Sequence, residues 1–422
     1  MSKVWSEIKY NFAYADAIDF DADSVYRYYL PMVMRTRNDV DFMDLLRRFM
    51  AAFDDGHTNV GYPSYNWSRI NDYAPIRAKE IDGRYYLSYV SEWSKLDSLA
   101  IGAELVEVDG IPVQEYVRKH YFPLFPGPER TKAFRVTDNY LCTGRIGSLF
   151  RGTIRQRNGQ SVHFKMRTDE RRLYRKKTKK EPREWTWTDF YKSRKENVTV
   201  EFLSPDSIAW MDIRLFDEDD IPTIRRHFEQ IRNRARGLIL DLRYCNGGSS
   251  IVGDSLLHHI IDADYLLIGK AMTRINNGYG RAQGNWQPQY EAFYRDRAYE
   301  MLPADTLRID RSQILRMPIV ILTGKRTVSA AETFLIQLME LPDRPRVIGQ
   351  QTAGTTGSPL IVDLPHNAWV RICTLQHLYP ISGKPFGKEG ILPDEIIAPT
   401  LEDYLTGRDA VLERALKIID PQ

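Results

Sequence analysis

The sequence predicts an α/β protein whose second half folds around a mainly parallel β-sheet. From about residue 196, apolar segments typical of strands alternate with segments of helical spacing. The predicted strands are SIAWMDIRLF, GLILDLR, PIVILTG and RVIG, and the helices between them are EDDIPTIRRHFEQIRNR, SIVGDSLLHHIID and SAAETFLIQLMEL. Strands that alternate with helices usually form parallel sheets with right-handed crossovers. The segment EDYLTGRDAVLERALKIID predicts one more amphipathic helix at the end.

Two other kinds of sequence come before this α/β part. Residues 1–62 are expected to be helical, because four apolar residues share one helical face: Leu46, Phe49, Met50 and Phe53. From residue 74 the segments are short and β-rich, and GAELVEVDGIPV indicates two strands around an Asp-Gly turn. We therefore divide the chain into helical (1–62), β-rich (74–170), basic linker or hairpin (171–195) and α/β (196–422) parts.

The composition narrows the class of protein. A hydrophobic content of 43% and a charged content of 27% over 422 residues are typical of a globular protein of two or three domains. The net charge of +3 does not favour nucleic acid as a partner. The basic run RRLYRKKTKKEPREW is interpreted as a solvated linker or hairpin tip. No apolar run approaches the roughly 20 residues of a transmembrane helix.

The cysteines and the amino terminus leave the compartment open. Cys142, Cys245 and Cys373 are widely spaced and form no CxxC motif, so neither a disulfide framework nor a zinc site is indicated. We expect no metal and no cofactor. The first residues lack the order of a signal peptide. Two alternatives remain: a cytoplasmic protein, or a protein exported to the periplasm or cell envelope whose signal has been removed.

The segment TVSAAETF places Ser329 where a predicted strand gives way to a helix. The first backbone N–H groups of a helix have no acceptor within it. In one interpretation the Ser329 side chain caps these groups and Glu332 completes a capping box. In the other, Ser329 is a nucleophile and the free N–H groups stabilise negative charge on the attacked carbonyl.

A second strand-to-helix turn, NGGSS, offers further free amides. Gly247 and Gly248 follow the strand GLILDLR, at the sheet edge where open α/β sheets usually hold their sites. Glycine lets backbone N–H groups approach a ligand closely. Taken alone, the pair is better explained by a tight structural turn. Together with the amide of Ala330, however, one of these glycine amides would form a two-donor oxyanion hole.

A catalytic serine needs a base, and His57 is the strongest of the eight histidines. The segment FDDGHTNV places it on a loop just after a predicted helix that ends at Gly56. A loop histidine bonded to Asp54 or Asp55 is the structural alternative.

In combination, these motifs resemble the C-terminal-processing (tail-specific) serine protease family, which includes the tricorn core protease and the interphotoreceptor retinoid-binding protein. The likeness runs in order through GLILDLRYCNGG, GKRTVSAAETF, RVIGQQTAGTTGS and KEGILPDEIIAPT, and FDDGHT resembles the tricorn-like branch. The resemblance implies a ClpP/crotonase-like catalytic domain, an N-terminal helical cap and an inserted PDZ-like domain. It assigns Ser329 as nucleophile, with an oxyanion hole formed by Ala330 and Gly247 or Gly248.

The base departs from the Ser–Lys branch of that family. Thr355 stands where that branch has its lysine, so the resemblance points to His57, with Glu389 as a weak candidate for the orienting carboxylate. The hypothesis is a serine peptidase that cleaves a peptide or protein substrate by acyl transfer. The alternatives are a non-catalytic protein that binds a peptide or hydrophobic ligand on the same scaffold, and a crotonase-type enzyme acting on a coenzyme A thioester.

Overall fold

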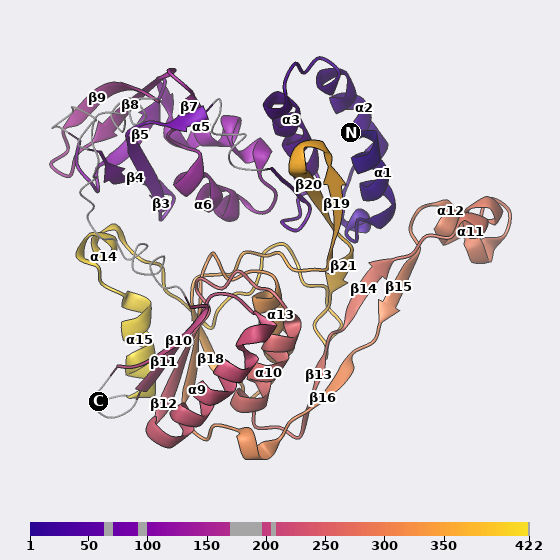
Figure 1. Cartoon of the computed structure of the whole chain (residues 1–422), viewed down its shortest axis with the longest axis vertical. Coiled ribbons are helices and arrows are strands. Elements are labelled where there is room, and N and C mark those ends of the chain that lie inside the picture. The colour runs from indigo at the N-terminus through magenta and orange to yellow at the C-terminus, as the bar shows by residue number, and fades with distance from the viewer. Residues whose placement is uncertain (63–70, 92–98, 169–195, 204–207, 421–422) are drawn as a thin grey trace.

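Three parts of the chain each form a hydrophobic core. The structure is a computed structural model that describes residues 1–62, 71–91, 99–168, 196–203 and 208–420. In the view of Figure 1, the N-terminal helices and the β-rich part lie above the α/β part. The predicted basic linker or hairpin at 171–195 lies outside the described residues. No helix in the described ranges is long and apolar enough to cross a membrane.

The α/β part is built on a six-stranded sheet with the order β10-β11-β12-β17-β18-β22. All neighbours pair in parallel except β10, which is antiparallel to β11 at one edge. The strands are β10 Val198–Phe202, β11 Ile208–Ile213, β12 Gly237–Asp241, β17 Ile319–Thr323, β18 Arg346–Gly349 and β22 Glu395–Ile396. The prediction of a mainly parallel sheet is therefore confirmed.

Helices cover both faces of this sheet. Leu238 and Leu240 of β12 belong to the core formed with three helices, whereas Ile239 belongs to the core formed with a fourth helix. The three are α9 Ile221–Arg234, α10 Ser250–Ile260 and α13 Ala330–Leu338, and the fourth is α15 Ala410–Ile419. Because side chains alternate between the faces of a strand, burial on both faces requires the continuous apolar runs seen in the sequence.

The carboxyl-terminal segment differs from its prediction. It forms two helices, α14 Leu401–Thr406 and α15, instead of one. Gly407 ends α14 in a left-handed conformation with φ of 72°. Asp409 then caps α15 by accepting a hydrogen bond from the amide of Leu412. A left-handed glycine directly after a helix is a common helix end.

The β-rich part is a six-stranded antiparallel sheet with two helices. Its strands are β3 Ile76–Ile81, β4 Arg84–Val90, β5 Glu104–Val108, β6 Ile111–Pro112, β8 Leu149–Arg155 and β9 Ser161–Arg167; β2 Asn71–Tyr73 and β7 Thr143–Arg145 pair separately. The helices are α5 Val113–His120 and α6 Glu129–Asn139. The predicted turn between β5 and β6 is confirmed, with positive φ at Asp109 and Gly110.

The N-terminal helices share their core with a hairpin from the far end of the chain. The helices are α1 Ser2–Asn11, α2 Ala22–Val33 and α3 Asp39–Ala51. The hairpin is β19 Pro359–Leu364 and β20 Ala368–Cys373, and the short strand β1 Asn59–Gly61 pairs with β20. The buried face of α3 is the predicted one, and it packs with Val370 and Ile372. Figure 1 shows β19 and β20 beside these helices.

A two-stranded arm extends from the α/β part (Figure 1). It contains the antiparallel pairs β13 Tyr265–Ile268 with β16 Asp305–Arg308 and β14 Ala271–Arg274 with β15 Tyr299–Leu302. Two short helices, α11 Gly278–Gln283 and α12 Glu291–Tyr294, form the tip. The strand β21 Leu375–His377 pairs with β14 and joins the arm to the rest of the protein.

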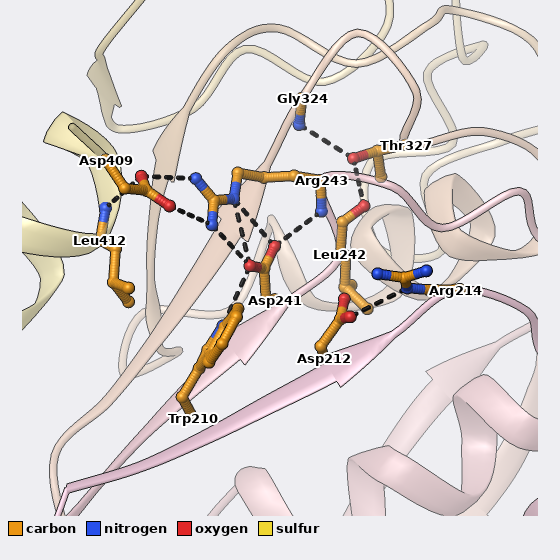
Figure 2. A network of polar contacts seen from close by, with 10 residues as sticks. All are labelled: Trp210, Asp212, Arg214, Asp241, Leu242, Arg243, Gly324, Thr327, Asp409 and Leu412. Carbon is orange, nitrogen blue, oxygen red and sulfur yellow. Dashed lines mark hydrogen bonds and ion pairs between the residues drawn. The ribbon is translucent and has the colours of Figure 1, made fainter. Parts of the chain in front are cut away.

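A buried polar network ties α15 to the end of β12 (Figure 2). Asp241 is fully buried and accepts hydrogen bonds from Trp210 Nε1 at 3.0 Å and from Arg243 Nη2 at 2.7 Å. The same guanidinium donates to both carboxylate oxygens of Asp409, at 2.7 and 2.9 Å. Because Asp409 caps α15, the network holds the helix against the carboxyl end of the sheet.

Replacing Arg243 with methionine is expected to destabilise the protein strongly. The change leaves Asp241 as a buried carboxylate without its cation, and removing one partner of such a pair typically costs about 3–5 kcal/mol. The measurement is the free energy of unfolding in urea. The matched control, Arg346→Met, removes a half-exposed partner of Glu395 and should cost less than about 1 kcal/mol. Equal losses in the two variants would contradict this account of the network.

Candidate active site

Two turns meet at the carboxyl edge of the parallel sheet. Because β12 and β17 are parallel neighbours, the turns that follow them leave the same edge. Thr327 joins the turns: its Oγ1 donates to the carbonyl of Leu242 at 2.7 Å and accepts from the amide of Gly324 at 2.9 Å (Figure 2). The amide of Val328 donates to the carbonyl of Cys245 at 3.2 Å. These bonds fix the backbone just before Ser329.

Ser329 has an unusual backbone conformation, with φ of 62° and ψ of −130°. Such a conformation costs a non-glycine residue about 1–3 kcal/mol and persists only where the surroundings enforce it. Its amide donates to the carbonyl of Thr355 at 3.0 Å, and its carbonyl accepts from the amides of Glu332 and Thr333. The side chain makes no capping hydrogen bond. The interpretation of Ser329 as a helix cap is therefore wrong.

The glycine turn packs directly against Ser329. A Cβ on Gly247 would lie 2.5 Å from Cβ of Ser329 and 2.9 Å from the amide nitrogen of Ala330, so no larger residue fits. Gly248 has φ of 134°, and its Cβ would lie 2.2 Å from the carbonyl oxygen of Phe216. In the described chain, the amides of Gly248 and Ala330 donate to no acceptor, whereas the Gly247 amide bonds to the buried thiol two residues before it.

The loop after α3 brings His57 to the same place. Its Nε2 lies 3.0 Å from Oγ of Ser329, although 272 positions separate the two residues in the chain. Its Nδ1 lies 2.6 Å from Oγ1 of Thr355. Among the described residues the His57 ring makes no direct bond to an aspartate, although the backbone amide of His57 donates to the Asp55 carboxylate; Asp54 pairs with Lys388 at 3.0 Å.

The hydrogen bonds around Thr355 indicate the tautomer of His57. Oγ1 of Thr355 donates to Oδ1 of Asp55, at the long distance of 3.4 Å, which leaves it free to accept from Nδ1–H of His57. The unprotonated Nε2 then accepts from the Ser329 hydroxyl. Asp55 is buried, and it also accepts from Oγ1 of Thr58 at 2.7 Å. Burial raises the pKa of Asp55.

Burial also dominates the charge state of His57. It lowers the pKa of the imidazole to about 3, and the positive charges of Arg371 and Arg135 act in the same direction. The ring is therefore neutral at physiological pH, the state in which it can accept a proton.

Glu332, expected only as part of a capping box, instead holds the loop that carries Thr355. Its fully buried carboxylate accepts from Oγ1 of Thr352 and from the amides of Gly354 and Thr355, both at 2.8 Å. Burial raises the pKa of Glu332 to about 7. The helix that begins next to Ser329 thus also positions the residue that contacts His57.

Ser329 and His57 lie in the wall of a cavity of about 530 Å³. Residues from α3 and the loop after it, from the β-rich part, from β20 and from the two turns form its lining. They include Arg47, Arg135, Arg371, Phe125, Tyr140, Asn246 and Trp369. A substrate in this cavity would contact all three parts of the chain.

Residues 207–397, which contain both turns and Ser329, match peptidase family S41. This part of the chain is a domain of peptidase family S41. Members of this family are serine-type peptidases, so the substrate class is peptide or protein. Residues 71–184 match a PDZ domain, and the fold class is confirmed as an S41 α/β domain with a PDZ domain and N-terminal helices.

Solved structures resemble this S41 peptidase over its whole length. Mature CPAF is 14% identical, with a TM-score of 0.70, and the alignment covers 99% of this chain and 95% of CPAF. Mature CPAF complexed with lactacystin gives 15% identity, a TM-score of 0.70 and coverage of 100% and 96%. A candidate peptidase from Parabacteroides merdae is 18% identical, with a TM-score of 0.56, and the alignment covers 99% of this chain and 95% of that peptidase. At these identities the likeness shows the fold alone. No curated protein matches in sequence.

The S41 peptidase does not bring every predicted site residue together. Glu389 has an exposed side chain and does not line the cavity, while its backbone carbonyl accepts from Arg130. The carboxylates near the site are Asp55 and Glu332 instead. Sequence reasoning treated Thr355 only as a missing lysine, and the hydroxyl beside a candidate histidine had no local signal that could reveal it.

We expect His57 to remain neutral well below the pH at which an ordinary histidine protonates. The pKa of about 3 in the folded state lies below the ordinary histidine value of 6.5 because the ring is buried. The measurement is the ¹³Cε1 chemical shift of labelled histidines, with His57 assigned from a His57→Gln spectrum. Because the unfolded ring protonates first, this residue lowers stability as the pH falls from 6.5 toward 3. A His57 signal that titrates near pH 6.5 would contradict the buried, neutral ring.

Proposed function

We propose that this protein cleaves peptide bonds by acyl transfer, with Ser329 as the nucleophile and His57 as the general base. The observation that carries the proposal is the 3.0 Å distance between His57 Nε2 and Ser329 Oγ at the cavity wall. A nucleophile within hydrogen-bond reach of a base, which a third group orients, is the arrangement that nucleophilic catalysis needs. The same distance favours a peptidase over a non-catalytic binding protein.

The first half of the reaction forms an acyl-enzyme. Oγ of Ser329 attacks the carbonyl carbon of the scissile bond while His57 Nε2 takes the hydroxyl proton. The resulting oxyanion is stabilised by the amides of Gly248 and Ala330, both of which lack an acceptor in the described chain. As the tetrahedral intermediate collapses, His57 returns the proton to the leaving amine. In the second half a water molecule replaces that amine, and the same groups act in the same roles.

Thr355 is the proposed orienting group for His57. By accepting from Nδ1–H, it leaves Nε2 unprotonated and directed at Ser329. Asp55 lies behind it and holds the hydroxyl at 3.4 Å, so its carboxylate acts on the imidazole through Thr355. The positive charge that His57 gains during attack is unfavourable in a buried site. The oxyanion on the two amides offsets this cost electrostatically at the moment when both charges form.

Ser329→Ala is expected to abolish covalent labelling by a fluorophosphonate probe, because the variant lacks the nucleophilic oxygen. His57→Ala should lower kcat by about 10²- to 10⁴-fold while the protein stays folded. Labelling is read by intact-protein mass spectrometry and turnover with a peptide library. Ser250→Ala, an exposed serine of α10, is the matched control and should label normally. If the unchanged protein neither labels nor cleaves any peptide, the proposal is wrong.

Thr355→Val is expected to lower kcat by about 10- to 100-fold with little change in KM. Valine has nearly the same shape but cannot accept from Nδ1–H, and a hydrogen bond to a charged group is worth about 1.5–3 kcal/mol. Thr355→Ser retains the hydroxyl and should restore most of the activity. A valine variant as active as the serine variant would show that Thr355 only fills space.

A further inference from the structure

Three arginines line the cavity that contains Ser329 and His57. They come from different elements: Arg47 from α3, Arg135 from α6 and Arg371 from β20. Among the described residues, the lining contains no aspartate or glutamate. A concave site with charges of one sign attracts ligands of the opposite sign.

The Arg371 guanidinium is held in place by two contacts that leave its terminal nitrogens available as donors. Its guanidinium lies over the ring of Trp369, 5.0 Å from the centroid, and Nε donates to Oδ1 of Asn59 at 3.3 Å. Asn59 is its direct partner in the pairing of β1 with β20. Within the described ranges, neither Nη atom has an acceptor. Stacking and one hydrogen bond thus present the two remaining nitrogens to a ligand without further ordering of the side chain.

Arg135 likewise has no carboxylate partner. In the part of the chain that the structure describes, no acidic oxygen lies within 4 Å of its guanidinium or of that of Arg371. The buried acid whose charge acts on both is Asp55, which bonds instead to Thr58 and Thr355. Burial lowers the pKa of both guanidinium groups, the expected cost of holding cations out of water without an anion.

Arg47 is already partly neutralised. It lies 3.6 Å from Asp44 and 5.9 Å from the centroid of the Tyr140 ring. The excess positive charge of the cavity therefore rests on Arg135 and Arg371. Both are near enough to His57 to disfavour its protonation, which places the charge beside the reacting groups.

We propose that Arg135 and Arg371 form a subsite for a carboxylate of the substrate, beside the bond that Ser329 attacks. Guanidinium groups bind carboxylates through paired, charge-assisted hydrogen bonds. The carboxylate comes either from an aspartate or glutamate side chain or from the end of the peptide chain. This inference rests on the proposed function for the role of Ser329, but the charge preference of the cavity is measurable without turnover.

The first experiment compares peptides that differ only in one carboxylate. N-acetylated decapeptides that the enzyme cleaves are prepared as C-terminal acids and amides, and blocked decapeptides are prepared with glutamate or glutamine at each position next to the scissile bond. We expect kcat/KM to be about 10- to 100-fold higher for the carboxylate member of one pair. A preference in the acid and amide pair identifies the chain end, and a preference in the glutamate and glutamine pair identifies a side chain.

Variants then test the two arginines. Arg371→Gln and Arg135→Gln should each bring the ratio of kcat/KM for the carboxylate peptide over its neutral partner close to one; this ratio is the readout because either change also alters the charge near His57. The matched control is Arg346→Gln, which removes one positive charge from the opposite end of the sheet and should leave the preference unchanged. Carboxylate and neutral peptides cleaved equally by the unchanged enzyme would overturn the proposal, as would a preference that survives both substitutions.

A binding measurement separates this inference from the proposed function. The Ser329→Ala protein is dialysed against N-acetylated decapeptides of mixed sequence, prepared in acid and amide forms and in glutamate and glutamine forms, and the retained peptides are quantified by mass spectrometry. The subsite is supported if Ser329→Ala retains carboxylate peptides and the double variants S329A/R371Q and S329A/R135Q do not. This result would hold even if the unchanged enzyme cleaves nothing. Equal retention of acid and neutral peptides by Ser329→Ala overturns it even if the enzyme is an active peptidase.

Discussion

The close contact of two turns at the carboxyl edge of the parallel sheet is the constraint on which the site depends. Gly247 lies so near Ser329 that a single methyl group would clash with the serine side chain and with the next amide. Thr327 holds the turns together through both of its hydrogen bonds. Only this approach places two unused amides and a strained serine in one place. The Arg243 network, at the same edge, holds helix α15 against strand β12 (Figure 2).

Pairing between distant segments supplies the other half of the site. The strand β1 pairs with β20, and the amide of Cys373 donates to Oγ1 of Thr58 at 3.1 Å. These bonds anchor the loop of His57 against a hairpin from the far end of the chain. The same pairing positions Arg371 through Asn59. One strand pair thus fixes both the proposed base and one proposed substrate-binding cation.

Several ionisable side chains near this site are buried, and burial disfavours their charged forms. Asp55 and Glu332 are held in the interior by hydrogen bonds, and burial raises the pKa of both. Arg135 and Arg371 are cations without a carboxylate partner in the described chain. A carboxylate ligand would satisfy them, and an oxyanion would offset the charge on His57. The unfavourable charges of the free protein therefore become favourable when the proposed substrate and transition state are bound.

The sequence by itself determined the α/β class, the mainly parallel pairing of the central sheet and the buried face of α3, because hydrophobic periodicity and apolar runs are local properties. Together with the family resemblance, it also singled out Ser329, His57 and the glycine turn. The carboxylates were different: Glu389 was chosen by position along the chain, whereas Asp55 and Glu332 surround the site. Thr355 beside His57, and Arg135 beside Arg371, became visible only in the tertiary structure. Hydrogen bonding and burial depend on which distant segments meet, and no local pattern in the chain specifies that.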